Sequence, residues 1–270
     1  MIHTTATIEE GAIIGSNVHI GPYSVIGPNV ILGDDVKISS HVIVMGYTSI
    51  GSHTQIYPYS VIGMPPQDLK YKNEITYINI GNNCTIREKV TIHAGTKKGN
   101  SVTKIGDNCF FMVSAHVGHD CIVGDNVLLI NQASLGGHSQ VGDYAVLGAF
   151  VTIHPFVRVG KHSYVAGMTG VEYDILPYGL AAGSPRDAYI KGVNIKGLRG
   201  RDFSREQIIS IQVAYKKIFN GPGIEIYDRA RDLIKNHPDN EQIEDIANFI
   251  TQRPETDRHF CFPNKRSTIK

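Results

Sequence analysis

An aliphatic residue recurs every six positions along most of the first 171 residues of this chain. From Ile14 the period runs through isoleucine, leucine and valine to Ile62, it resumes at Ile80, and from Ile105 it continues to Val171. A fixed short period is the signature of a repeat architecture, because each unit is too small to bury its apolar face and must stack on its neighbours. We therefore expect a solenoid rather than a layered globular domain.

The other positions of the hexapeptide predict its local structure. If the aliphatic residue is position one, position five is small or β-branched, as at Val18, Ala115 and Ala133. Alternate residues of a strand face the same side, so positions five and one both point inward. Position two is often glycine, as at Gly15 and Gly124, which we interpret as a residue with the unusual backbone angles of a tight turn. Three hexapeptides then make one triangular coil of 18 residues, with equivalent corners about 4.8 Å apart.

This period is similar to that of the hexapeptide-repeat proteins, whose fold is a left-handed parallel β-helix, and the hand is taken from that resemblance. We expect polar loops to project where the period is interrupted, near residues 66–79 and 98–104. The pattern fades after Val171, and Ser204 with Gln207 resembles a helix capping box. Further helices are predicted at about 224–236 and 241–252. The expected division is a mainly β domain, the β-helix, over residues 1–190 and a small C-terminal α-helical domain over 191–270.

Composition limits the partners and the compartment. The chain has 26 Lys and Arg against 25 Asp and Glu, and a net charge of +1 gives no general attraction for nucleic acid or an anionic membrane. No apolar run approaches the ~20 residues of a membrane-spanning helix, so no transmembrane segment is expected. The cysteines show no C-x-x-C pair, which favours a reducing compartment, the cytoplasm. Three of them occupy position five and are predicted to belong to the core: Cys84, Cys109 and Cys121.

Most of the 12 histidines fall at outward positions, where a single imidazole needs no function. One corner differs, because it carries His116, His119 and Asp120 together. Adding one 18-residue coil places Gly137 directly above His119. The same count, with 98–104 treated as a simple insertion, brings three more histidines to this edge: His93, His138 and His154.

A carboxylate beside an imidazole orients the ring and supports its protonated form, which suits a general base near neutral pH. A backbone N–H at Gly137 is placed to stabilise an oxyanion. This combination suits acyl transfer to a hydroxyl. Two other interpretations stay open here. Histidine is a common zinc ligand, and a trimeric β-helix gathers several across a subunit boundary. The second of these two interpretations is a ladder of histidines that only stabilises the solenoid.

Six segments in order along the chain resemble the UDP-N-acetylglucosamine O-acyltransferase family, and the resemblance covers nearly the whole chain. They are Gln67-Asp-Leu-Lys70-Tyr, Ile86-Arg-Glu, Val90-Thr-Ile-His93-x-Gly-Thr, Ala115-His-Val-Gly-His119-Asp-Cys, Gly192-Val-Asn-Ile-Lys-Gly-Leu198 and Phe203-Ser-Arg-Glu206. The resemblance implies a cytoplasmic homotrimer with active sites between neighbouring subunits. It also implies transfer of an R-3-hydroxyacyl chain from acyl carrier protein to the 3-position of UDP-N-acetylglucosamine, the first step of lipid A synthesis. The reaction implied by this resemblance requires no metal and no organic cofactor.

Residue by residue, the resemblance implies that His119 is the general base, that Asp120 orients it and that the Gly137 N–H holds the oxyanion. Gly167 matches the position that sets the depth of the acyl pocket, and its missing side chain predicts a longer hydroxyacyl chain. The remaining matches are to substrate-contacting residues: Gln67, Asp68, Lys70, His93, His116, His138, His154, Asn194 and Arg201. A basic surface for the acidic carrier protein is expected on the C-terminal helices, at Lys216, Lys217, Arg229 and Arg231.

The sequence departs from better-known members at Pro155, Lys196 and Gly200, and the last two leave the nucleotide contacts open. Some members of the family accept a 3-amino sugar and form an amide, and that acceptor also stays open. Among trimeric hexapeptide-repeat proteins, the alternatives are a coenzyme A-dependent acetyltransferase and a γ-type carbonic anhydrase with zinc between subunits. A non-catalytic spacer is the remaining alternative.

Overall fold

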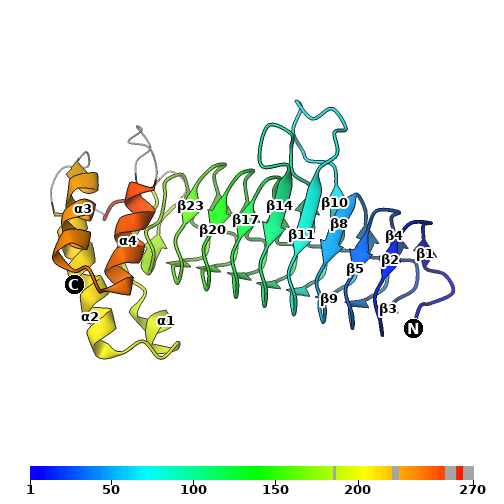
Figure 1. The fold of residues 1–270 in the computed structure, drawn as a ribbon, viewed down its shortest axis with the longest axis horizontal. Coiled ribbons are helices and arrows are strands. Elements are labelled where there is room, and N and C mark those ends of the chain that lie inside the picture. The colour runs from blue at the N-terminus through cyan, green and yellow to red at the C-terminus, as the bar shows by residue number, and fades with distance from the viewer. Residues whose placement is uncertain (185–186, 221–224, 253–259, 264–270) are drawn as a thin grey trace.

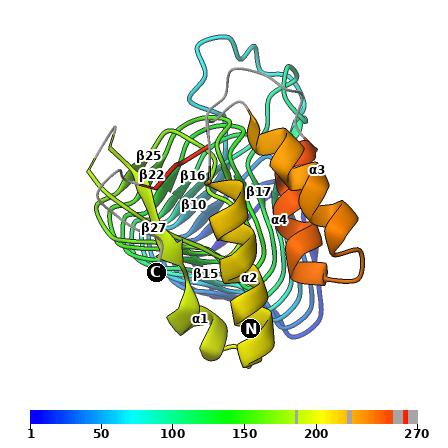
Figure 2. The ribbon, with the colours of Figure 1, turned by 90° about the vertical axis from the view of Figure 1, so that its left-hand side faces the viewer.

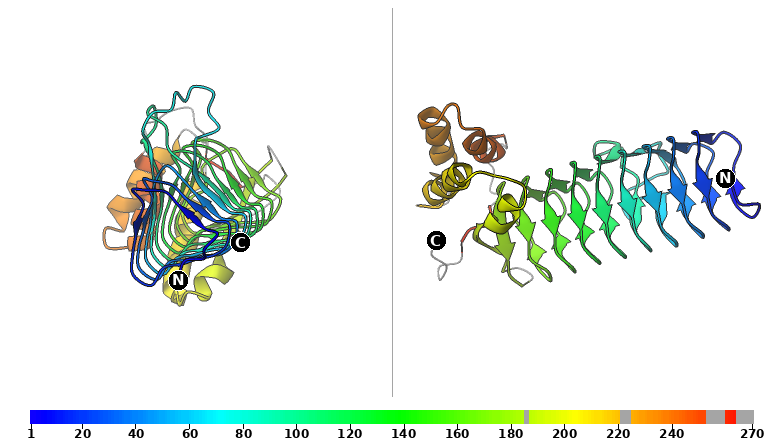
Figure 3. Two further views of the ribbon diagram at one scale, coloured as in Figure 1. Left: turned by 90° about the vertical axis from the view of Figure 1, so that its right-hand side faces the viewer. Right: turned by 90° about the horizontal axis from the view of Figure 1, so that it is seen from below.

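The structure is a computed structural model that describes residues 1–184, 187–220, 225–252 and 260–263. A long stack of coils carries helices at its C-terminal end (Figure 1), and the coils have a triangular outline in end view (Figure 3). Strands on the three sides form three sheets, and up to Val171 successive strands of the chain visit them in turn. Among the described strands all pairings are parallel except that of the last strand, Tyr189–Val193, which pairs antiparallel with Gly179–Ala182 in the same sheet. The predicted solenoid is therefore confirmed as a parallel β-helix.

The first sheet consists of β1 (Thr7–Ile8), β4 (Val25–Ile26), β7 (Ile43–Val44), β10 (Val61–Met64), β13 (Thr91–His93), β16 (His116–Val117), β19 (Ser134–Leu135), β22 (Thr152–Ile153) and β25 (Gly170–Val171). The second consists of β2 (Ile13–Ile14), β5 (Ile31–Leu32), β8 (Tyr47–Ile50), β11 (Tyr77–Ile80), β14 (Val102–Ile105), β17 (Ile122–Val123), β20 (Gln140–Val141) and β23 (Arg158–Val159). The third consists of β3 (His19–Ile20), β6 (Lys37–Ile38), β9 (Gln55–Ile56), β12 (Thr85–Ile86), β15 (Phe110–Phe111), β18 (Leu128–Leu129), β21 (Val146–Leu147), β24 (Tyr164–Val165), β26 (Gly179–Ala182) and β27 (Tyr189–Val193). We call the corner from first to second sheet the first edge, that from second to third the second edge, and that from third to first the third edge.

Positions one and five fill the interior as predicted. Ile26, Val30 and Ala115 are fully buried. A fully buried valine or isoleucine contributes about 1.5–3 kcal/mol relative to an exposed one. The three cysteines at position five are buried and free, which confirms that they belong to the core.

The interpretation of the position-two glycines was wrong. The left-handed backbone angles fall at position four, for example at Asn17, where φ is 56°, and at Asp120, where φ is 59°. Gly15 and Gly124 do not have positive φ. Glycine occupies these positions because the next coil approaches closely: a Cβ at Gly15 would lie 2.7 Å from the carbonyl carbon of Gly33 in that coil. The corners therefore turn mostly on residues other than glycine, often asparagine, aspartate, histidine, tyrosine or phenylalanine, and the position-two glycine leaves room for the coil above.

Two loops project from the stack, but their bounds differ from those predicted. The first occupies residues 65–76 and the second residues 94–101, because residues 77–79 and 102–104 belong to strands. β11 pairs over four residues with both β8 and β14, so the strands under the loops are longer than the usual two residues. Ile78 and Thr103 fill the inward positions of these longer strands.

The C-terminal helices are α1 (Ile195–Arg199), α2 (Arg205–Ile218), α3 (Ile226–Asn236) and α4 (Glu241–Thr251). Ser204 and Gln207 form the predicted capping box at the start of α2. The predicted start of the next helix, near 224, lies outside the described residues. The helices pack at the end of the stack (Figure 2), where Lys161 Nζ lies 2.7 Å from Asp245 Oδ2 on α4. β27 extends the third sheet to Val193, and the domain division at residue 190 remains a prediction.

No helix in the described part of the chain is long and apolar enough to cross a membrane.

Candidate active site

The strand register confirms the arithmetic that places the histidine cluster. Val117 of β16 pairs with Leu135 of β19, an offset of 18 residues, and the N–H of His138 donates to the carbonyl oxygen of His119 at 2.8 Å. Ile92 pairs with Val117, so the second loop is a simple insertion in the coil below. His93, His119, His138 and the others of the predicted cluster therefore lie on the first edge.

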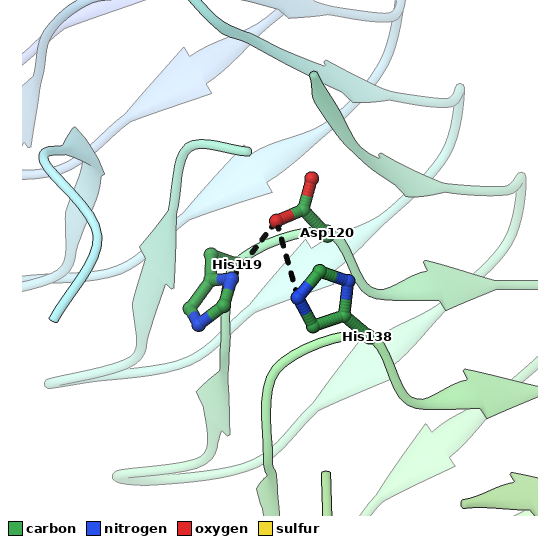
Figure 4. A group of neighbouring side chains, drawn as sticks. All are labelled: His119, Asp120 and His138. Atoms are coloured by element: carbon green, nitrogen blue, oxygen red, sulfur yellow. Dashed lines mark hydrogen bonds and ion pairs between the residues drawn. The ribbon is translucent and has the colours of Figure 1, made fainter. Parts of the chain in front are cut away.

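His119 and Asp120 form a hydrogen-bonded dyad (Figure 4). His119 Nδ1 lies 2.9 Å from Asp120 Oδ2, and the carboxylate side chain is fully buried while the imidazole is 19% exposed. A carboxylate accepts, so Nδ1 carries the proton and donates it, which leaves a lone pair on Nε2. Among the described residues nothing is hydrogen-bonded to Nε2. The imidazole is thus oriented, and its free nitrogen is available as a base.

The second loop holds the Asp120 carboxylate. The backbone N–H of Thr96 donates to both carboxylate oxygens at 3.0 Å, the Thr96 hydroxyl donates to Oδ2 at 2.7 Å, and the Asn100 N–H donates to Oδ1 at 3.0 Å. Burial alone raises the pKa of Asp120, but the donors on Thr96 and His119 outweigh it and hold that pKa below its ordinary value. Asp120 is therefore ionised at neutral pH. Sequence reasoning missed Thr96 and Asn100, because the loop has no period.

Gly137 leaves room for the imidazole and offers a free donor. A Cβ at this position would lie 2.5 Å from Nε2 of His119, so only glycine fits above the ring. The N–H groups of the flanking residues Gly136 and His138 are used in backbone hydrogen bonds between coils. Within the described residues the N–H of Gly137 has no such partner. A base and an oxyanion donor therefore lie side by side, as acyl transfer requires.

The surrounding histidines are neutral at neutral pH. His93 and His116 meet edge to face at 4.9 Å, and His116 Nδ1 lies 2.7 Å from the Thr91 hydroxyl. Burial, together with the positive charge of neighbouring His93 and His119, lowers the pKa of His116 to about 4. Burial likewise lowers the pKa of His93. These rings can hydrogen-bond a sugar or a carbonyl group without adding charge to the site.

His138 and the first loop complete this edge. His138 Nε2 lies 3.8 Å from Asp120 Oδ2, and its ring is stacked on Phe156 at 4.3 Å. Burial lowers the pKa of His138, and the nearby charges of Asp120 and Asp68 oppose that shift. Asp68 Oδ1 accepts the Lys70 N–H at 2.9 Å. Gln67, Lys70 and His154 are exposed on the same edge.

Three predicted residues lie on the other two edges. Asn194 caps α1 on the second edge, where its Nδ2 donates to the His162 carbonyl oxygen at 2.9 Å. Arg201 Nη2 donates to the Tyr144 carbonyl oxygen at 2.8 Å on that edge, and its Nη1 is buried without a partner in the described structure. Gly167 follows β24 on the third edge. One chain therefore does not bring Asn194, Arg201 or Gly167 to His119.

The structure also bears on the alternative of a metal site and on the predicted basic surface for the carrier protein. One oxygen of Asp120 and nitrogens of His119 and His138 lie within 4.8 Å of one another, a spacing compatible with a metal ion. Both oxygens of Asp120 already accept several hydrogen bonds, so the arrangement favours an orienting carboxylate over a metal ligand.

On the C-terminal helices, Arg229 and Arg231 are paired with Glu225 and Asp228, at 3.4 and 2.7 Å. The carrier-protein surface there stays a prediction, carried by Lys216 and Lys217.

Known proteins share this sequence and fold. An acyl-[acyl-carrier-protein]--UDP-N-acetylglucosamine O-acyltransferase of Campylobacter concisus is 44% identical over 252 residues, which cover 93% of this chain and 94% of the relative. The chain belongs to the UDP-N-acetylglucosamine O-acyltransferase family. A relative of the same name from Aliarcobacter butzleri is 45% identical over 249 residues, 92% of this chain and 94% of that protein.

Family sequence patterns and solved structures agree with this membership. Residues 174–261 match the second domain of UDP N-acetylglucosamine O-acyltransferase, and residues 11–46 and 103–137 match the bacterial transferase hexapeptide pattern. The UDP-N-acetylglucosamine acyltransferase of Campylobacter jejuni superposes with a TM-score of 0.89 at 35% identity over 98% of this chain and all of that one. That of Francisella novicida gives 0.92 at 33% identity over all of this chain and 96% of that one. In this O-acyltransferase the coil is thus the predicted left-handed β-helix.

Proposed function

We propose that this chain transfers an R-3-hydroxyacyl group from acyl carrier protein to the 3-hydroxyl of UDP-N-acetylglucosamine, the first step of lipid A synthesis in the cytoplasm. The observation that carries the proposal is the His119–Asp120 dyad beside the unused N–H of Gly137. It stands in a chain 44% identical to an enzyme named for this transfer. The chemistry needs no cofactor, because base, orienting carboxylate and oxyanion donor are all protein groups.

In the proposed mechanism, His119 Nε2 removes the proton of the sugar 3-hydroxyl as its oxygen attacks the thioester carbonyl carbon. The carbonyl π electrons move to oxygen, where the Gly137 N–H stabilises the negative charge. Collapse of this intermediate breaks the carbon–sulfur bond, and the imidazolium returns the proton to the leaving thiolate of the carrier protein. Asp120 supports the imidazolium between these steps, as a buried carboxylate hydrogen-bonded to Nδ1 does.

Substrate contacts are assigned by chemistry and position. The imidazole rings on the first edge are proposed to hydrogen-bond the hydroxyl and amide groups of the sugar and the acyl chain: His93, His116, His138 and His154. Gln67, Asp68 and Lys70 extend from the loop of residues 65–76 on the same edge and are proposed to hold donor and sugar-nucleotide groups. Asn194 and Arg201 are proposed to lie near the nucleotide, because a guanidinium pairs well with a diphosphate.

The distribution over three edges supports a homotrimer. The base lies on the first edge, Asn194 and Arg201 on the second, and Gly167 on the third. The edges of one prism face apart, so residues from different edges meet only when a second chain is set beside the first. A closed ring of three copies allows every chain to give its first edge to one neighbour and another edge to the next.

Mixing two inactive variants tests this shared site. His119→Ala chains lack the base, and Arg201→Ala chains lack the proposed phosphate contact. We expect each homotrimer to be impaired, and we expect activity to reappear when the two are unfolded and refolded together, since some mixed interfaces then carry both residues. Light scattering should give a mass of three chains. Recovery absent from the mixture, with trimers still formed, would contradict a site that takes His119 from one chain and Arg201 from its neighbour.

A series of donors tests the reaction and its chain length together. With UDP-N-acetylglucosamine and R-3-hydroxyacyl carrier proteins of increasing length, we expect an ester product at the 3-position and a preference for the longer chains. The physical reason is that Gly167 has no side chain to shorten the acyl pocket. Mass spectrometry of the product shows both that the acyl group has been transferred and how long it is. Transfer of short chains alone would contradict the assignment of Gly167.

The same assay separates the alternatives. Turnover with acetyl-coenzyme A at ordinary concentrations would favour a small acetyltransferase, and hydration of carbon dioxide lost on chelation would favour a zinc enzyme. An amide product with the 3-amino analogue, and no ester with UDP-N-acetylglucosamine, would change the acceptor but not the catalytic groups.

A further inference from the structure

The donors that hold Asp120 are absent from the other corner aspartates of this solenoid. Asp125 and Asp143, on the second edge, are exposed, and each accepts one backbone N–H from the coil below, at 2.8 Å. Asp120 receives its donors from the inserted loop of residues 94–101 and is fully buried by it. The insertion in the repeat therefore supplies the donors that hold the buried carboxylate of the proposed dyad.

The loop is shaped to close over this carboxylate. The N–H groups of Gly99 and Ser101 both donate to the Thr96 carbonyl oxygen, at 3.0 and 3.1 Å, which folds the loop into a tight turn. At Gly99 a Cβ would lie 2.3 Å from the carboxylate carbon of Asp120, so a side chain at this position would open the turn. Thr96 itself is only 3% exposed.

Two donors converge on the catalytic oxygen. Oδ2 accepts the Thr96 hydroxyl at 2.7 Å and His119 Nδ1 at 2.9 Å. The terminal torsion of an aspartate is broad, so a carboxylate with fewer donors has freedom to rotate out of the plane in which it accepts the imidazole N–H. The main-chain N–H of Thr96 is shared between both oxygens and the Asn100 N–H holds Oδ1, whereas the Thr96 hydroxyl donates to the oxygen that faces His119.

We propose that Thr96 is a positioning residue of the reaction, whose hydroxyl fixes Oδ2 of Asp120 against His119 Nδ1. It acts through Asp120 and touches neither substrate nor reacting atom. The inference rests on the proposed function, because it concerns the base of that reaction. A hydrogen-bonded partner of this kind fixes the tautomer and the plane of a working imidazole.

Thr96→Val removes the hydroxyl at constant shape, and Thr96→Ser keeps it. We expect Thr96→Val to lower kcat by roughly tenfold or more, as the loss of a hydrogen bond to a charged group does. We expect KM for the sugar nucleotide to stay within about twofold, since the residue does not contact substrate. Thr96→Ser should recover most of kcat. Thr169→Val is the matched control, because Thr169 is buried and its hydroxyl has no partner in the described structure.

A double-mutant cycle with Asp120→Ala shows whether Thr96 acts through the carboxylate. We expect Thr96→Val to change the residual rate of Asp120→Ala by less than about twofold. Equal losses in both backgrounds, a serine variant as poor as the valine, or wild-type kcat in Thr96→Val would each overturn the inference. His119→Ala is assayed in parallel: if it is inactive while Thr96→Val is normal, only the inference fails, and if it is active, the proposed mechanism fails.

Discussion

Replacing His119 by alanine is expected to lower kcat by about 10²–10⁴-fold, the range that a positioned general base contributes. Nε2 of His119 has no hydrogen-bond partner in the described structure and lies beside the oxyanion donor Gly137, and the buried carboxylate of Asp120 orients it. The initial rate with a 3-hydroxyacyl carrier protein at saturating UDP-N-acetylglucosamine measures the loss. The folded state should be retained, since the ring is partly exposed and the hydrogen bonds that join this coil to the next are made by the backbone.

His53→Ala is the matched control for this variant. His53 lies on an N-terminal coil, its side chain is 60% exposed, and its contact is an ion pair of 3.6 Å with Asp35. A surface pair of this kind contributes little to stability, about 0–1 kcal/mol. Activity and melting temperature of His53→Ala should match those of the wild type. A His119→Ala enzyme that keeps its rate within about tenfold of the wild type would remove general-base catalysis from the mechanism.

Adding one methyl group at Gly137 is expected to be nearly as damaging. The Cβ of Gly137→Ala would lie 2.5 Å from Nε2 and 2.6 Å from Cε1 of His119. The ring must therefore leave its position between the Asp120 carboxylate and the Gly137 donor. Misplacing a catalytic group by about 1 Å costs on the order of 10²-fold in rate. Gly137 does not have positive φ, so alanine fits the backbone and the fold should persist. Steady-state rates and circular dichroism separate the two effects.

Gly27→Ala provides the comparison at a glycine of the same edge. A Cβ there would lie 3.0 Å from the flexible Sδ of Met45, which can move aside, and 3.3 Å from the Met45 Cα, and its three nearest atoms all belong to Met45 rather than to a catalytic group. We expect wild-type rates from this variant. If Gly137→Ala were equally active, His119 would not work from the position seen in the structure.

The fold and the core of the site follow from counting residues. Parallel pairing in register fixes the offset of 18 residues, so the sequence alone places Gly137 above His119. Loop contacts do not follow, because a loop such as 94–101 has no period from which the positions of Thr96 and Asn100 are counted. The role of the position-two glycines was also hidden, since glycine serves either an unusual φ or a close approach, and the sequence does not separate these reasons.

Residues on different edges show a second limit. A period tells how far along the stack Gly167 stands relative to a corner, but Arg201 lies beyond the last repeat, and the period says nothing of a neighbouring chain. Their relation to His119 came from resemblance, and it remains a proposal that the mixing experiment tests.

The base His119 and the oxyanion donor Gly137 lie on two consecutive coils in the middle of the stack, and the hydrogen bond from the His138 N–H to the His119 carbonyl oxygen joins these coils. In a solenoid each coil touches only its neighbours, so local opening starts at an end and proceeds coil by coil. The first strands, β1 and β2, are not fully buried on either face. Thermal fraying of this end therefore has several coils to melt before it reaches the base, and the chemistry is insulated from the least stable part of the molecule.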